Sequence, residues 1–243
     1  MLKGIIGFLM ALMVLIPTSM SMAGTLIENF DDGDDEGWER SPQNPDSKVF
    51  WGVDKKENAM KFDPKGVGWQ QAISQMNFVG TSQVKNVREW ADYDVEVDIK
   101  LVEAANHPGG VRGRVDLKTG GHYVVWLYPA SGDLRLYKNP GWDINTGIAT
   151  VGVGKFKPEI NEYHKVKLSM QGSDIKVYYD GKLEIEAKDK DHKQGTIAVG
   201  SQNRVVYFDN IQVEGPQIPS HDMSPVEPEG KLTTTWARIK AHN

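Results

Sequence analysis

The clearest structural signal in the chain is the stretch Asp94-Val-Glu-Val-Asp-Ile-Lys-Leu101. Apolar and charged side chains alternate strictly along it, with Val95, Val97, Ile99 and Leu101 between Asp94, Glu96, Asp98 and Lys100. A period of two places successive side chains on opposite faces of a strand, whereas a helix needs a period near 3.6. The stretch therefore predicts a strand with one buried face and one face in water.

The same alternation recurs in the chain after this strand. It is seen in Val111–Leu117, Tyr123–Leu127, Leu134–Lys138, Lys165–Met170, Ile175–Asp180, Lys182–Ala187, Thr196–Gly200 and Arg204–Val213. Asp180-Gly181 predicts a tight hairpin, because such a turn needs positive φ at both central residues. Weaker signals predict a strand at Gly24–Phe30 and a hairpin of Val49–Val53 with Ala59–Phe62, while Trp69–Phe78 is ambiguous. Many short antiparallel strands without an amphipathic helix predict an all-β sandwich or barrel.

The two ends of the chain have a different character. Met1-Leu2-Lys3 precedes an apolar run from Gly4 to Ile16, and Ser21-Met22-Ala23 follows. This layout is typical of a cleaved signal peptide at residues 1–23. The alternative is a membrane anchor, but a spanning helix needs about 20 apolar residues, so we expect no membrane span after cleavage. We therefore expect a secreted or periplasmic protein.

A proline-rich segment follows the last strand. Residues 215–243 contain Pro216, Pro219, Pro225 and Pro228, which predicts an extended linker and a short C-terminal segment outside the domain at 24–214. The spacing of Leu232, Trp236 and Ile239 leaves open either a frayed tail or a docking peptide.

Composition excludes several classes of function. The formal net charge is −5 and the chain has no cysteine. A nucleic-acid partner would require a basic face, so none is expected. Thiol chemistry and thiolate metal sites are ruled out, and an exported chain without disulfides must rely on its core or on a bound ion.

The C-terminal half resembles a known superfamily. Tyr163–Leu183, Gly195–Gly200 and Val206–Val213 resemble concanavalin A-like lectin/glucanase domains, and Glu28–Gly33 with Gly37-Trp38 resembles their usual start. The resemblance implies an antiparallel jelly-roll sandwich of two sheets, related to laminin-G-like and carbohydrate-binding modules. A neighbouring family is the 3-keto-disaccharide hydrolases, whose last strand usually reads Phe-Arg-Asn-Ile, whereas this chain has Phe208-Asp-Asn-Ile211. The superfamily contains lectins, hydrolases and structural modules, so it does not define a function.

The family 16 glycoside hydrolase motif is incomplete here. That motif places two glutamates and a central aspartate on one strand, and a retaining mechanism needs two carboxyls about 5–5.5 Å apart. Glu96 and Asp98 begin the pattern, but Lys100 stands where the second glutamate belongs. We therefore predict no catalytic residue, and interpret this strand as a solvated outer face.

A binding face is the stronger candidate. If consecutive strands pair, one sheet surface carries Arg112, Arg114, Asp116, His122, Trp126, Tyr128, Arg135 and Tyr137, with Trp142 in the next loop. Aromatic rings pack on the apolar face of a sugar, and charged groups bind its hydroxyls. The resemblance places these strands near the concave, ligand-carrying sheet. The alternative is that the rings pack under a loop and the arginines form ordinary surface pairs.

An acidic segment near the N-terminus suggests a structural calcium ion. Oxygen ligands suit calcium, but an EF-hand would require a glutamate at Gln43. Related sandwich modules bind calcium between N-terminal acids and an aspartate of the last strand, which implies Glu28, Asp31, Asp32, Asp34 and Asp209 here. The alternative is a solvated acidic turn.

The sequence thus predicts an exported carbohydrate-binding domain. A sugar-processing hydrolase or lyase and a structural or adhesive surface domain remain the alternatives.

Overall fold

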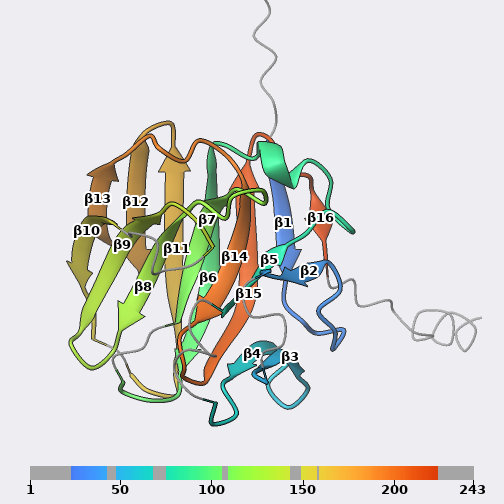
Figure 1. Ribbon diagram of the computed structural model, residues 1–243, viewed down its shortest axis with the longest axis vertical. Helices are drawn as coiled ribbons and strands as arrows, with labels where there is room; N and C mark the ends of the chain where they lie inside the picture. Colours follow the sequence, from blue (N-terminus) through green and yellow to red (C-terminus); the bar gives the residue numbers. More distant parts are fainter. Residues whose placement is uncertain are drawn as a thin grey trace, which may run out of the picture.

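The structure of the protein is a computed structural model, which describes residues 23–42, 48–67, 75–105, 109–142, 149–157 and 159–223. The expectations for a signal peptide at 1–23 and for the segment beyond residue 223 lie essentially outside this part. Within it the chain forms two antiparallel β-sheets that lie face to face as two layers (Figure 1). The described residues contain no α-helix and one short 3₁₀ helix, η1 (Val87–Glu89).

The first sheet has nine strands. Its main path runs in the order β13 (Lys182–Lys188), β12 (Asp174–Tyr179), β11 (Tyr163–Gln171), β6 (Tyr93–Leu101), β15 (Val206–Gly215), β1 (Gly24–Glu28) and β16 (His221–Asp222). The hairpin of β3 (Phe50–Asp54) and β4 (Ala59–Asp63) joins this sheet through β15.

The second sheet has seven strands. Its order is β10 (Ala149–Lys155), β9 (Asp133–Asn139), β8 (His122–Tyr128), β7 (Gly109–Val115), β14 (Thr196–Ser201), β5 (Gln75–Val79) and β2 (Trp38–Arg40). Neighbours that are far apart in sequence, such as β7 and β14, show that the chain crosses between the two layers as a jelly roll does.

The predicted fold class, an all-β two-sheet antiparallel jelly-roll sandwich, is confirmed. The hairpin at residues 50–63 is present, and Asp180 and Gly181 both have positive φ in their turn. The structure adds strands that the sequence patterns did not reveal, namely β2, β10 and β16. β16 pairs in parallel with β1, so the ordered fold continues past residue 214 into the segment expected to be a linker.

The core lies between the inner faces of the two sheets. In β6, Val95, Val97 and Ile99 are almost fully buried, whereas the acids between them point away from the core. The inner face of the opposite sheet supplies Val111, Tyr123 and other apolar side chains to the same cluster. Burial of this apolar surface is the main stabilising contribution, at about 25 cal/mol per Å².

A buried tyrosine links the two sheets at one end. The Tyr93 hydroxyl, on β6, accepts the backbone N–H of Arg114 in β7 at 2.5 Å. It also donates to the carbonyls of Gly195 at 3.0 Å and Thr196 at 3.2 Å, at the start of β14. Burial raises the pKa of Tyr93 above its ordinary value, so the hydroxyl keeps its proton for this contact.

We expect Tyr93→Phe to lower the free energy of unfolding by about 1–3 kcal/mol, because it leaves the buried Arg114 N–H without an acceptor. Urea denaturation measures the change. Tyr163→Phe is the matched control, because the buried Tyr163 hydroxyl has no hydrogen-bond partner among the described residues. Equal effects of the two substitutions would contradict the role given to Tyr93.

Candidate functional site

The candidate site is the outer face of the seven-stranded sheet, which we define as the side facing away from the core. β8 and β9 pair so that His122 faces Asn139, Val124 faces Tyr137 and Trp126 faces Arg135. Their neighbours Tyr123, Val125 and Leu136 point into the core cluster. Because side chains alternate between faces, the register gathers polar and aromatic groups on one outer surface. Its main residues are Arg112, His122, Val124, Trp126, Tyr128, Asp133, Arg135, Tyr137 and Asn139.

One part of this outer face is partly accessible to solvent, and its polar side chains pair with one another. Arg135 forms an ion pair with Asp133 at 3.0 Å, and its guanidinium lies 4.5 Å from the centre of the Tyr128 ring. The Tyr128 and Tyr137 hydroxyls lie 3.3 Å apart. Burial, followed by the contact with Tyr137, raises the pKa of Tyr128 above its ordinary value, so this hydroxyl is protonated at neutral pH. The half-buried side chain of Tyr128 gives the surface a partly accessible aromatic group.

The other part of the face is buried and holds a charged side chain without a counter-ion among the described residues. Arg112 on β7 is 0% exposed, and its guanidinium lies 4.5 Å from the centre of the Trp126 ring. None of its three guanidinium nitrogens has a hydrogen-bond partner in the described part of the chain. Burial lowers the pKa of Arg112 to about 9, so the side chain still carries its charge at neutral pH.

Two further buried polar groups of this face, His122 and Asn139, are incompletely bonded among the described residues. The His122 Nδ1–H donates to the Gly120 carbonyl at 2.7 Å, which leaves Nε2 as a buried acceptor, and this atom has no partner among the described residues. The Asn139 Nδ2 donor is likewise buried without a partner in the described ranges. Burial, followed by the charge of Arg112, lowers the pKa of His122 to about 3, so its imidazole is neutral at physiological pH.

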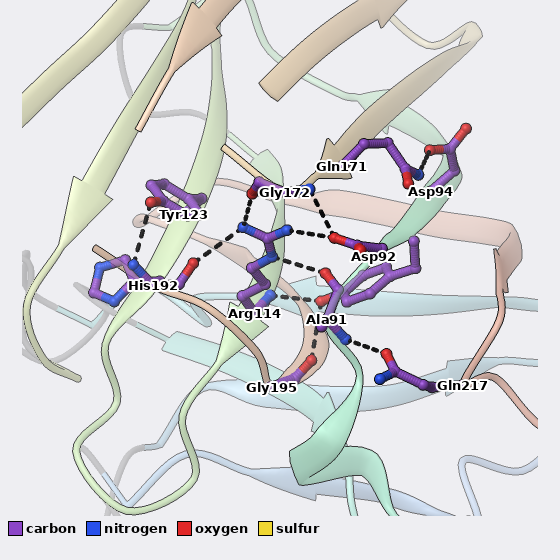
Figure 2. A network of polar contacts seen from close by, with 11 residues as sticks. Ala91, Asp92, Asp94, Arg114, Tyr123, Gln171, Gly172, His192, Gly195 and Gln217 are labelled. Carbon is purple, nitrogen blue, oxygen red and sulfur yellow. Dashed lines mark hydrogen bonds and ion pairs between the residues drawn. The ribbon is translucent and has the colours of Figure 1, made fainter. Parts of the chain in front are cut away.

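Arg114 and Asp116 do not share the outer face. Arg114 has a φ of 51°, and the pairing of β7 with β14 shifts register next to it, as expected for a β-bulge. The bulge turns the guanidinium towards the end of the sandwich (Figure 2), where it donates to the carbonyls of Ala91, Gly172 and His192 at 2.8–3.1 Å. It also contacts the Asp92 carboxylate at 3.3 Å. The strict alternation assumed for this strand was wrong at Arg114.

Asp116 closes the turn that follows β7. Its carboxylate accepts the backbone N–H of Lys118 and the Thr119 hydroxyl, both at 2.8 Å. Trp142 does reach the outer face, where its ring lies 5.7 Å from Phe78 in a small apolar cluster with Val115 and Ala198. Trp142 also covers Gly120, at which an added Cβ would lie 2.3 Å from the indole.

Trp126 differs from the expected sugar-stacking group. Its ring is 2% exposed and lies against Arg112, so the alternative of a packed aromatic side chain describes it better. The structure instead leaves Tyr128 and Trp142 partly accessible. Asn139 is a residue of this face that the sequence reasoning missed, although it continues the alternation two positions beyond Tyr137.

The five expected calcium ligands all accept hydrogen bonds from nearby groups of the protein. Both carboxylate oxygens of Glu28 are engaged, one by the Phe30 N–H at 2.9 Å and one by the Trp38 indole N–H at 3.0 Å. Asp32 and Asp34 accept backbone N–H groups in their own turn. Among the described residues no group of three or more His, Cys, Asp or Glu side chains could hold a metal ion. The calcium site stays a prediction.

The strand that carries the partial hydrolase motif belongs to the other sheet. Glu96 and Asp98 point away from the core on β6 and form ion pairs with Lys165 at 3.0 and 3.1 Å. Lys100 pairs with Glu57. These contacts agree with a charge-paired outer surface, remote from the candidate site on the opposite sheet.

The fold resembles solved structures of carbohydrate-active proteins. A carbohydrate-binding module, CBM66 of Bacillus subtilis, matches with a TM-score of 0.56 at 16% identity, over 74% of this chain and 96% of that one. A beta-glucanase of Bacillus licheniformis matches with a TM-score of 0.56 at 13% identity, over 78% and 97% of the two chains. A native glycosidic hydrolase gives 0.56 at 11%, over 81% and 98%.

These similarities show that the chain shares its fold with these proteins, the two-sheet jelly-roll sandwich that the predicted resemblance implied. No family model and no curated protein matches the sequence. A helix with the length and apolarity required to cross a bilayer is not found in the described ranges.

We expect Asp209→Asn to stabilise the protein at neutral pH. Burial, together with the nearby carboxylates of Asp98 and Asp31, raises the pKa of Asp209 to about 6. The folded state therefore binds the proton more tightly than the unfolded state, and stability is lost as the pH rises through 6. The amide should add about 1 kcal/mol to the free energy of unfolding at pH 7.5 after allowance for solvent screening, and little at pH 4.

Denaturation at both pH values with EDTA present measures this difference. Asp54→Asn is the contrasting variant, because a hydrogen bond from the Lys56 N–H lowers the pKa of Asp54. The ionised Asp54 carboxylate therefore stabilises the folded state at neutral pH, and this contribution is lost in acid. Asp54→Asn should consequently destabilise the protein at pH 7.5. A loss of stability in Asp209→Asn at pH 7.5 would contradict the burial argument.

Proposed function

We propose that the protein is an exported carbohydrate-binding protein and that the outer face of the seven-stranded sheet is its binding surface. The observation that carries the proposal is the gathering of Tyr128, Arg135 and Tyr137 next to buried polar groups on that one face. Sugar rings present an apolar face and many hydroxyls, so a surface of aromatic rings and fixed polar groups suits them. The fold shared with a carbohydrate-binding module supports the proposal.

Binding is favoured over hydrolysis by the distribution of acids. Asp133 is the only acidic residue of β7, β8 and β9, all three of which are fully described. Its carboxylate is held by Arg135 at 3.0 Å and by Lys155 at 2.6 Å. Glycoside hydrolysis generally needs two carboxyl groups across one bond, and these strands do not supply the pair.

We expect Tyr128→Ala to weaken polysaccharide binding at least tenfold, because the half-buried ring is a partly accessible aromatic surface of the site. A glycan array identifies the ligand, and isothermal titration calorimetry then compares wild type with the variant. Tyr178→Ala is the control, since Tyr178 is a half-buried tyrosine on β12 of the other sheet. Failure of the wild-type protein to bind any plant, algal or bacterial polysaccharide would overturn the proposed function.

A further inference from the structure

The unpaired guanidinium of Arg112 is the most unusual group in the described part of the chain. Arginine remains charged in proteins, and a buried charge without a partner destabilises the fold. Arg114, two residues away, shows what a satisfied buried arginine looks like here, with three carbonyls and one carboxylate around it. Arg112 has the Trp126 ring on one side and no hydrogen-bond acceptor among the described residues.

The chemistry missing around Arg112 is that of an anion. A guanidinium presents parallel N–H donors that match the two oxygens of a carboxylate. The guanidinium lies against the Trp126 ring, and its three buried nitrogens have no hydrogen-bond partner among the described residues. Since Arg112 is shielded from water, a carboxylate that pairs with it must also leave water, and each ion compensates the desolvation of the other.

The neighbouring groups are complementary to a hydroxyl group. His122 Nε2 is an acceptor and Asn139 Nδ2 is a donor, and the two residues face each other across β8 and β9. A hydroxyl group both donates and accepts, so it satisfies both atoms at once. His122 lies diagonally across from Arg112, because Arg112 pairs with Val124. A ligand that fits all three side chains therefore carries a carboxylate and a hydroxyl on one small ring.

We propose that Arg112 binds the carboxylate of a uronic acid residue, which makes the ligand of this face an acidic polysaccharide. The inference rests on the proposed function and specifies its ligand. The chain carries a net charge of −5, so long-range attraction does not draw a polyanion to it. Selective binding of an acidic polymer would therefore have to come from a local, built site.

The test uses polygalacturonate, alginate and hyaluronate, each beside its carboxyl-reduced form, in which every carboxylate has become a neutral hydroxymethyl group. We expect the purified protein to bind at least one acidic polymer and to lose at least tenfold in affinity when that polymer is reduced. Binding should persist in 0.5 M NaCl, because a buried ion pair is weakly screened. Affinity electrophoresis and calorimetry give the comparison.

Arg112→Met should abolish the preference for the acidic polymer and raise the melting temperature of the ligand-free protein, since it removes an unpaired buried charge. Arg112→Lys, which keeps the charge but loses the paired donors, should bind less tightly than wild type. Arg88→Met is the charge-matched control, because Arg88 is exposed on η1 away from the sheet face. If Arg112→Met does not fold, the inference is tested by the wild-type protein alone, through its affinities for the acidic polymer and for the reduced polymer.

Several results would overturn this inference. Equal binding of the acidic and the reduced polymers would contradict recognition of a uronic acid but would leave the proposed carbohydrate binding intact. A preference for sulfated polymers would have the same consequence. A lower melting temperature for folded Arg112→Met would mean that Arg112 already has a structural partner. No binding to any polysaccharide, acidic or neutral, would remove the proposed function together with the inference.

Discussion

The β-bulge at Arg114 is the constraint on which the arrangement of this protein depends. It adds one residue to β7 relative to the neighbouring strand β14, so Arg112 and Arg114 do not lie on the same face of the sheet. Arg114 turns to the end of the sandwich, where its guanidinium joins the segment before β6, the turn between β11 and β12, and the connection from β13 to β14 (Figure 2). The Tyr93 hydroxyl holds the backbone at the same point. Both sheets are thereby tied together at one end by polar groups that satisfy one another.

The two outer surfaces of the sandwich are built on different electrostatic principles. On the nine-stranded sheet the charged residues form cross-strand pairs, such as Lys165 with Glu96 and Asp98, which are half-exposed and each contribute little. On the seven-stranded sheet, by contrast, Arg112, His122 and Asn139 are buried and incompletely bonded among the described residues. An unsatisfied buried group costs about 1–3 kcal/mol, so such groups concentrate where a ligand completes them. This contrast is the physical reason for assigning binding to the second surface.

Part of this surface could be predicted from the sequence. The alternation placed Arg112, His122, Trp126, Tyr128, Arg135 and Tyr137 on one face, and the register of β7, β8 and β9 brings them together. Arg114 and Asp116 could not be separated from them, because a bulge leaves no mark in a pattern of apolar and polar residues. The solvent exposure of Trp126 could not be predicted from the sequence either. Alternation indicates which face of the sheet a ring lies on, but not whether other residues cover it.

The sequence by itself determined the class of fold, the positions of most strands and the two faces of each, because these depend on local periodicity and turn chemistry. Asp94–Leu101 shows this most directly, since its apolar residues form the core and its charged residues the outer surface. Only the tertiary structure decided which charges find partners. Arg112 and Arg114 have the same chemistry and nearly the same sequence position, yet one is fully bonded and the other is not. Hydrogen bonds between segments distant in the chain make that difference, and no local pattern encodes them.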